Sequence, residues 1–161
     1  MHVAKAPTPL LVPTVLYMDA SEAARSTFLT AFRHEFDVLL AFDLGTAMAH
    51  LERTAVHVVI CDQCLPGVTG SMVLARVRER YPQIKRMLVT SHADLQGIVD
   101  ALNQGGACFY IQEPWEVEVV RTAVARAFTE IRQEQERKNL TDRLVAANQQ
   151  LEFALRQSLL A

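Results

Sequence analysis

Short apolar runs alternate regularly with segments of helical periodicity along this chain, and that alternation limits the folds open to it. The β-rich runs cover residues 14–18, 37–42, 58–62, 84–90 and 107–112. Apolar residues recur at helical spacing over residues 21–34, 45–52, 72–81 and 95–102, and from residue 117 onward. Five strands that alternate with five helices pair in parallel through right-handed crossovers. The sequence therefore predicts an α/β fold with a doubly wound, five-stranded parallel sheet.

Polar residues end three of the predicted strands. The third strand delivers Asp62, and Leu65, Pro66 and Gly67 follow it as a turn signal. Asp19 ends the first strand, and Thr90 ends the fourth. In a parallel sheet the crevice outside the carboxyl ends of the strands binds ligands, so these side chains are candidates for a site. The alternative for Asp62 alone is a turn residue that only starts a loop.

The predicted fourth helix carries the clearest apolar stripe of the chain. Leu95, Ile98, Val99 and Leu102 recur at three-one-three spacing, and Gly105-Gly106 stops the pattern. A stripe of this kind usually packs a helix against a core.

The composition argues against several classes of function. The formal net charge is −2, which gives no electrostatic reason to expect binding to nucleic acid or to an anionic membrane. No apolar run approaches the ~20 residues of a membrane span. Residues 1–13 lack the features of a signal peptide, and we expect a flexible leader there. Three cysteines, an odd number, do not make a disulfide framework, so we expect a cytoplasmic protein.

The order of the strand-end residues resembles the receiver domain of bacterial two-component response regulators. The motif comprises Asp19, Asp62 with Leu65-Pro66-Gly67 behind it, Thr90, Tyr110 and Pro114. The resemblance covers roughly residues 14–130 and implies the flavodoxin-like strand order 2-1-3-4-5. Further residues around strands 4 and 5 are similar to those of receivers found with HD-GYP phosphodiesterase domains or in hybrid signalling proteins, among them Arg80-Tyr81-Pro82, Ala93-Asp94-Leu95, Gly105-Gly106 and Pro114-Trp115.

The resemblance implies a phosphoacceptor rather than an enzyme. Asp62 would accept a phosphoryl group from a sensor histidine kinase or a phosphotransfer protein. Mg²⁺ would be held by Asp19, Asp62 and the backbone carbonyl of Cys64. Thr90 would contact the phosphoryl oxygens, and Tyr110 would turn inward, so that the face made by helix 4, strand 5 and helix 5 carries the signal.

Three further positions have structural roles by the same resemblance. Pro66 and Gly70 shape the loop after the phosphoacceptor, and Pro114 follows strand 5. The Glu113-Pro114 bond is expected to be cis, which would orient the residue before the proline.

Two positions depart from the family pattern. Ala20 stands where receivers usually have a second acid that binds the metal directly, and Arg25 keeps the usual register. Glu113 replaces the lysine that contacts the phosphoryl group. Glu113 could restore the carboxylate lost at Ala20 by turning toward the metal. Two interpretations remain open: a phosphorylation-controlled receiver, and a phosphorylation-independent pseudo-receiver that serves as a dimerisation or interaction module.

No proline or glycine occurs from Val117 to Ala161, so one extended helix can run through this stretch. Its first part continues the stripe that packs on the predicted receiver, through Val120, Val124, Phe128 and Ile131. Residues 132–139 are almost wholly polar, which places the end of the receiver domain at residue 131 and makes it residues 14–131.

The remaining segment, residues 132–161, is predicted to be a helical extension. Its apolar residues Leu140, Leu144, Ala147, Leu151 and Ala154 follow the four-three spacing of a coiled coil. We expect a homodimer through this helix; the alternative is an unpaired amphipathic tail. No pattern of an output domain is visible in the sequence, and we expect either a stand-alone regulator or a fragment of a longer protein.

Overall fold

The structure, a computed structural model, describes residues 12–91, 95–103, 106–107 and 109–160. Its elements alternate as the sequence predicts. In chain order they are β1 (Thr14–Met18), α1 (Glu22–Phe32), β2 (Asp37–Ala41), α2 (Leu44–Arg53), β3 (Val58–Asp62), β4 (Cys64–Leu65), β5 (Val68–Thr69), α3 (Gly70–Arg80), β6 (Lys85–Thr90), α4 (Leu95–Asn103), β7 (Phe109–Gln112) and α5 (Val117–Leu160).

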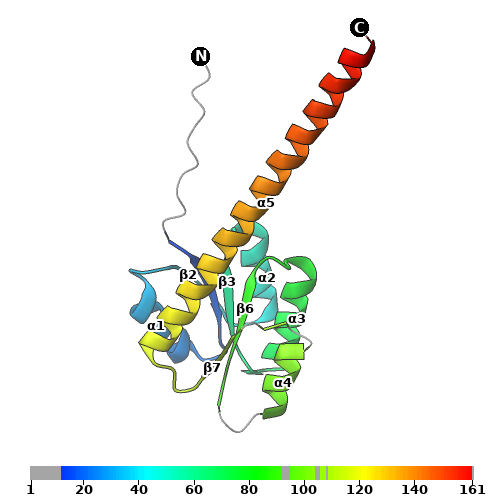
Figure 1. Ribbon diagram of the computed structural model, residues 1–161. Coiled ribbons are helices and arrows are strands. Elements are labelled where there is room, and N and C mark those ends of the chain that lie inside the picture. Colours follow the sequence, from blue (N-terminus) through cyan, green and yellow to red (C-terminus); the bar gives the residue numbers. More distant parts are fainter. Residues whose placement is uncertain (1–11, 92–94, 104–105, 108, 161) are drawn as a thin grey trace. The chain divides into compact units, whose positions relative to one another are not determined.

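Five strands form one parallel sheet in the order β2-β1-β3-β6-β7 (Figure 1). This is the predicted order 2-1-3-4-5 when only the strands of that sheet are counted. The central strands β1, β3 and β6 consist almost wholly of buried side chains, as expected for strands covered on both faces. The flavodoxin-like fold and the long C-terminal helix are therefore confirmed.

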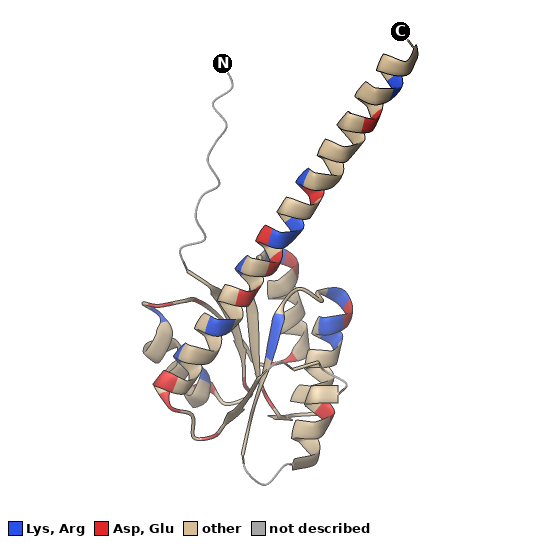
Figure 2. Ribbon diagram, viewed as in Figure 1, with Lys and Arg blue, Asp and Glu red and all other residues tan. Residues whose placement is uncertain are grey.

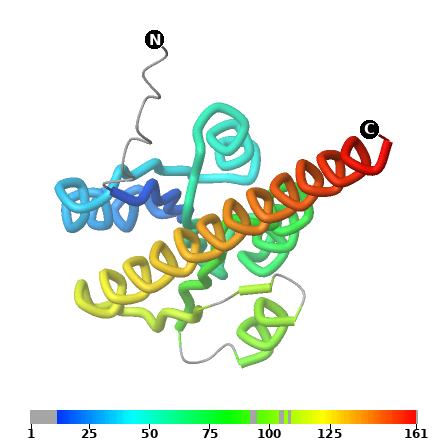
Figure 3. The backbone as a smooth tube through the Cα atoms, turned by 45° about the horizontal axis from the view of Figure 1, so that its top comes forward, coloured from blue at the N-terminus to red at the C-terminus, as the bar shows by residue number. Residues whose placement is uncertain are grey.

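Helices cover both faces of the sheet (Figures 1 and 3). On one face α1 and the first turns of α5 bury Phe28, Phe32, Val120 and Val124 against the strands. On the other face lie α2, α3 and α4, whose buried hydrophobic side chains belong to a second core cluster. The sheet thus has two separate cores, and each is built from side chains that alternate along the same strands.

Polar residues just before three helices fix where those helices begin. The side chains of Ser21, Asp43 and Thr69 each accept a hydrogen bond from the backbone N–H three residues later. Such caps satisfy an N–H group that has no partner within the helix. Thr69 starts α3 at Gly70, two residues before the predicted start at residue 72.

Two segments differ from the sequence-based expectation. Residues 65–67, expected as a turn, belong to a small antiparallel hairpin of β4 and β5. Gly67 lies between them with a φ of 73°, a value that suits glycine. Strand β2 ends at Ala41 rather than at Phe42, which is 53% exposed. The predicted strand was one residue too long, because the pairing of β2 with β1 ends at Ala41.

The apolar stripe of α4 does not pack on the core. Leu95, Val99 and Leu102 are exposed, and only Ile98 is half-buried. The buried side of α4 instead consists of the small residues Gly97 and Ala101. The helix was predicted correctly, but its orientation was not.

By its contacts the chain divides into two compact units, and the second begins at Thr129. In this second unit the helix is continuous, and every described side chain from Arg132 onward is exposed. Acidic and basic residues are interspersed along α5 (Figure 2). Across the described part of the chain, none of the helices combines the length and the apolar character that a bilayer crossing requires.

Candidate functional site

Three carboxylates meet at the carboxyl edge of the sheet. Asp19 follows β1, Asp62 ends β3 and Glu113 follows β7. One ligand oxygen from each lies within 4.8 Å of those from the other two. Parallel strands end at the same edge, and this is what brings together residues that are up to 94 positions apart (113 − 19). We call Asp19, Asp62 and Glu113 the acid cluster.

Asp19 is the most firmly held member of the acid cluster. Its carboxylate is buried and accepts two hydrogen bonds, one from the Tyr17 hydroxyl at 3.0 Å and one from the Ser21 backbone N–H at 2.9 Å. Arg25 donates to the backbone carbonyls of Asp19 at 2.7 Å and Ala20 at 3.1 Å. The backbone and the carboxylate at this position are therefore both fixed by hydrogen bonds.

The acid cluster concentrates negative charge. Burial, and then the charges of Glu113 and Asp19, raise the pKa of Asp62 to about 7, although backbone hydrogen bonds from Cys64 and Gln63 oppose this. Burial and then Asp19 also raise the pKa of Glu113, and a hydrogen bond with Asp62 acts in the other direction. Like charges in a partly desolvated space cannot all ionise easily. A cation would relieve this repulsion.

The donor set fits Mg²⁺. Mg²⁺ prefers hard oxygen ligands and is commonly held by one or two carboxylates with water completing the shell. The acid cluster supplies three carboxylates at one point. Because residue 20 is an alanine, the cluster would have only two carboxylates without Glu113. The backbone carbonyl of Cys64, the other expected ligand, stays a prediction.

The two residues with expected switch roles lie on neighbouring strands. Thr90 ends β6 and is 2% exposed, and its backbone carbonyl accepts the Glu113 N–H at 2.9 Å. Its hydroxyl donates to the Ser91 carbonyl at 3.4 Å. Tyr110 is half-buried in β7, opposite Leu88 of β6. Thr90 therefore adjoins the acid cluster through the backbone of Glu113.

Gly70 and Pro114 lie where the backbone leaves little freedom. A Cβ atom at Gly70 would lie 2.4 Å from the Asp62 carbonyl oxygen, so a larger residue would displace the strand that carries Asp62. The Glu113-Pro114 bond is cis, as the resemblance predicts. Pro66 adjoins Gly67 in the β4–β5 hairpin.

Comparison with known proteins identifies the family. The model of the response regulator receiver domain matches residues 15–125. The chain belongs to this family. Among solved structures, it resembles the signal receiver domain of an HD domain-containing protein from Pseudomonas fluorescens Pf-5, with a TM-score of 0.76 and 28% identity, over 81% of this chain and 96% of that one.

Curated relatives of this receiver are much longer proteins. The hydrogenase transcriptional regulatory protein HoxA of Cupriavidus necator is 36% identical over 115 residues, which are 69% of this chain and 24% of HoxA. The response regulator protein FleR of Pseudomonas aeruginosa is 35% identical over 106 residues, 65% of this chain and 21% of FleR. The chain spans about a quarter of the length of these relatives.

Two polar contacts of the receiver site were not predicted from sequence. Tyr17 lies in a buried strand, where a tyrosine hydroxyl needs a partner, and that signal could have pointed to Asp19. The second contact joins Gln63 and Ser71, which are 6% and 3% exposed. The Gln63 Oε1 accepts from both the N–H and the hydroxyl of Ser71 at 2.9 Å. No spacing rule relates these two residues, so the sequence offered no signal.

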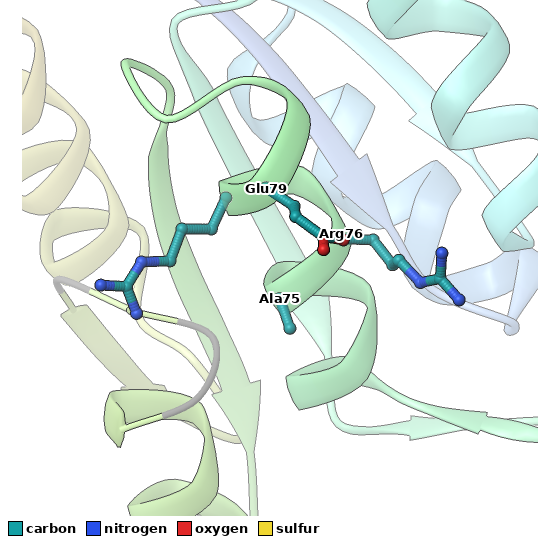
Figure 4. Close-up of a pocket in the computed structure, with 4 residues that line it drawn as sticks. Ala75, Arg76 and Glu79 are labelled. Carbon is teal, nitrogen blue, oxygen red and sulfur yellow. The ribbon is translucent and has the colours of Figure 1, made fainter.

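A shallow pocket lies on α3, apart from the acid cluster. It is lined by Ala75, Arg76, Arg78 and Glu79. In the close-up the side chain of Arg76 extends away from Ala75 rather than across it (Figure 4). Since its lining holds none of the predicted site residues, it plays no part in the proposed chemistry.

Proposed function

We propose that this receiver is a phosphoacceptor whose acid cluster binds Mg²⁺ and whose Asp62 receives a phosphoryl group from a sensor histidine kinase or a phosphotransfer protein. The observation that carries the proposal is the approach of Asp19, Asp62 and Glu113 to within 4.8 Å at the carboxyl edge of the sheet. Membership of the receiver family supports the same function, because its members are signalling domains rather than enzymes.

In this reaction an oxygen of ionised Asp62 attacks phosphorus. The new O–P bond forms as the P–N bond of the phosphohistidine breaks, and the imidazole leaves with a proton from solvent. Bound Mg²⁺ would offset the charge of the phosphoryl oxygens. Only the carboxylate form of Asp62 is nucleophilic, and its pKa of about 7 leaves it partly protonated at neutral pH. Ion binding would favour the reactive form by lowering that pKa.

Glu113 takes a different role from the lysine that it replaces. It supplies a third carboxylate to the acid cluster, in compensation for Ala20. It offers no positive charge to the phosphoryl group. We therefore expect phosphorylation to be slow, because one of the cations that stabilise the transition state is missing.

The receiver would pass its signal to partners through two surfaces. Thr90 and Tyr110 would couple the phosphoryl group to the face made by α4, β7 and α5, as in the family. The second surface is the helical extension, residues 132–161, whose exposed Leu140, Leu144 and Leu151 keep the coiled-coil spacing. These leucines support a homodimer, because a lone helix leaves them in water.

Intact-mass spectrometry tests the proposal. The protein is incubated with Mg²⁺ and either acetyl phosphate or phosphoramidate, beside Asp62→Asn. We expect a phosphoryl adduct in the wild type and none in the variant. Glu113→Lys combined with Ala20→Asp restores the family pattern and should increase the adduct. An adduct that persists in Asp62→Asn would place the phosphoryl group elsewhere.

The second candidate function is a phosphorylation-independent pseudo-receiver. Glu113 favours it, because an anion replaces a cation beside the incoming phosphate. In that case Asp62 would be vestigial and the chain would serve dimerisation or protein interaction. Absence of both an adduct and a calorimetric signal for Mg²⁺ would select this function.

A further inference from the structure

A buried hydrogen bond and a group of packed rings lead from the acid cluster to the only tryptophan of the protein. The Tyr17 hydroxyl donates to Asp19 Oδ2 at 3.0 Å. The Tyr17 ring stacks on Phe28, and Phe28 in turn contacts Trp115. The order is therefore Trp115 to Phe28 to Tyr17 to Asp19.

The rings of this chain are packed tightly enough to fix the hydroxyl. Tyr17 is 1% exposed and stacks on Phe28, with ring centroids 4.1 Å apart and planes 5° from parallel. Trp115 packs edge-on against Phe28 at 5.8 Å and also contacts Phe32 at 5.7 Å. Tyr17 cannot turn away from Asp19 unless this aromatic group also rearranges.

Trp115 is also connected to the acid cluster through the backbone. Glu113 precedes it by two residues, across Pro114, and α5 begins two residues after it at Val117. Two members of the acid cluster, Asp19 through Tyr17 and Glu113 through the chain, therefore converge on Trp115.

We propose that Tyr17 is a positioning residue that orients Asp19 for a divalent cation and conveys occupancy of the acid cluster to Trp115 at the start of α5. The proposal rests on the proposed function, since it requires that the acid cluster bind the ion. Tyr17 itself touches neither ion nor phosphoryl group. It holds one carboxylate oxygen of Asp19, and the Ser21 N–H holds the other at 2.9 Å.

The physical reason is that both ion and tyrosine use the same carboxylate. An ion that draws on the Asp19 oxygens changes the length or angle of the Tyr17 hydrogen bond. Because the Tyr17 ring stacks on Phe28, which contacts Trp115, that change alters the surroundings of the indole. Residues that orient a metal ligand from outside typically matter about 10-fold to 100-fold for metal affinity. This link is separate from the expected route through Thr90 and Tyr110.

The fluorescence of Trp115 makes the link measurable in the full chain. Mg²⁺ is titrated into the wild type, Tyr17→Phe and Tyr81→Phe, with tryptophan emission and calorimetry recorded on the same samples. Tyr81 is the matched control, because it also loses a hydroxyl but lies at the end of α3. In the wild type we expect a saturable change in emission with the midpoint given by calorimetry. Tyr17→Phe should weaken Mg²⁺ binding about tenfold and abolish the emission change, and Tyr81→Phe should match the wild type.

The outcomes separate this inference from the proposed function. If calorimetry shows Mg²⁺ binding but wild-type emission stays constant, or if Tyr17→Phe keeps the wild-type affinity and response, the inference is overturned and the ion site stands. If the wild type shows no Mg²⁺ binding at all, both fall together. Circular dichroism verifies that Tyr17→Phe is folded. Should the variant not fold, the wild type still tests the inference. An emission midpoint that agrees with the calorimetric midpoint supports it, and one that disagrees overturns it.

Discussion

The two faces of the sheet are built from different kinds of side chain. On the α1 and α5 face the core contains an aromatic group that includes buried Tyr17, Phe28, Phe32 and Phe36. On the α2, α3 and α4 face none of the described buried residues is aromatic, and most are aliphatic. Large interlocked rings leave few alternative arrangements, so the first face should be the more rigid one.

The difference is greatest at α4. Its buried residues, Gly97 and Ala101, have almost no side chain to remove from water. Its other link to the domain is polar, because the Ser71 hydroxyl lies 3.1 Å from the Gly97 carbonyl and 2.9 Å from the Gln63 Oε1. Little apolar burial means weak anchoring. We therefore expect α4 to be anchored more weakly than the α1 and α5 face. Asp19 contacts that face through Tyr17, whereas Asp62 adjoins Gln63, whose side chain contacts Ser71.

The largest expected effect comes from removing the centre of the aromatic face. Phe28→Ala should lower the free energy of unfolding by about 3–5 kcal/mol, because it deletes a fully buried ring and leaves a cavity. Urea denaturation monitored by circular dichroism measures this. Leu95→Ala on exposed α4 is the control and should change little. A loss below about 1 kcal/mol at Phe28 would show that the aromatic face repacks easily and would remove the contrast.

The acid cluster, where the two faces meet, should make stability depend on pH. The pKa of Asp62 is raised to about 7 in the folded protein and is about 3.9 when unfolded. The folded state therefore binds more protons between these values, and stability is lost as pH rises from about 4 to about 7. The full shift corresponds to roughly 4 kcal/mol, but half-exposed Asp62 is screened by solvent, which reduces the expectation to about 1–2 kcal/mol.

Asp62→Asn isolates that contribution. At pH 8 the variant should be more stable than the wild type by about 1–2 kcal/mol, and at pH 4 the two should coincide. Thermal unfolding at both pH values measures the difference. Saturating Mg²⁺ should stabilise the wild type at pH 8 and reverse the order. If the variant had the same advantage at both pH values, charge repulsion would not be the cause.

The fold could be predicted from the sequence because two periodicities decide it. Apolar runs such as residues 58–62, separated by helical stripes, admit little except parallel strands with crossover helices. The orientation of α4 could not be predicted in the same way. A stripe with Leu95 and Val99 normally faces a core, but Gly97 and Ala101 permit a closer approach on their side, and only the structure shows which side the neighbours occupy.

The candidate site was predictable in part for a related reason. Acids at strand ends converge by topology, so Asp19 and Asp62 could be paired before any coordinates. Glu113 was a candidate only through the family resemblance, in which it takes the place of a lysine. The contacts of Tyr17 and Gln63 could not be found this way. Each depends on the direction of one side chain within a packed interior, and no sequence period encodes that direction.

A smaller effect should follow from cutting the polar link to α4. Ser71→Ala removes a buried hydroxyl and leaves the Gly97 carbonyl without that contact, which should destabilise the protein by about 1–2 kcal/mol. Hydrogen exchange should accelerate in α4 and stay unchanged in α1. Exposed Ser26→Ala is the control for loss of a serine hydroxyl. Equal acceleration in both helices would mean that the two faces loosen together, which would contradict the expected difference in rigidity between them.

The smallest effect is expected on the exposed side of α4. Val99→Ser should change the free energy of unfolding by no more than about 0.5 kcal/mol, because Val99 is already 46% exposed. Ala101→Ser is the matched variant on the buried side of the same helix, and it should destabilise by about 1–3 kcal/mol, since its hydroxyl enters an apolar core. Urea denaturation at two protein concentrations measures both. If Val99→Ser destabilises as much as Ala101→Ser, and more at the higher concentration, then a second copy of the chain covers the stripe, and α4 is anchored by association rather than by its own core.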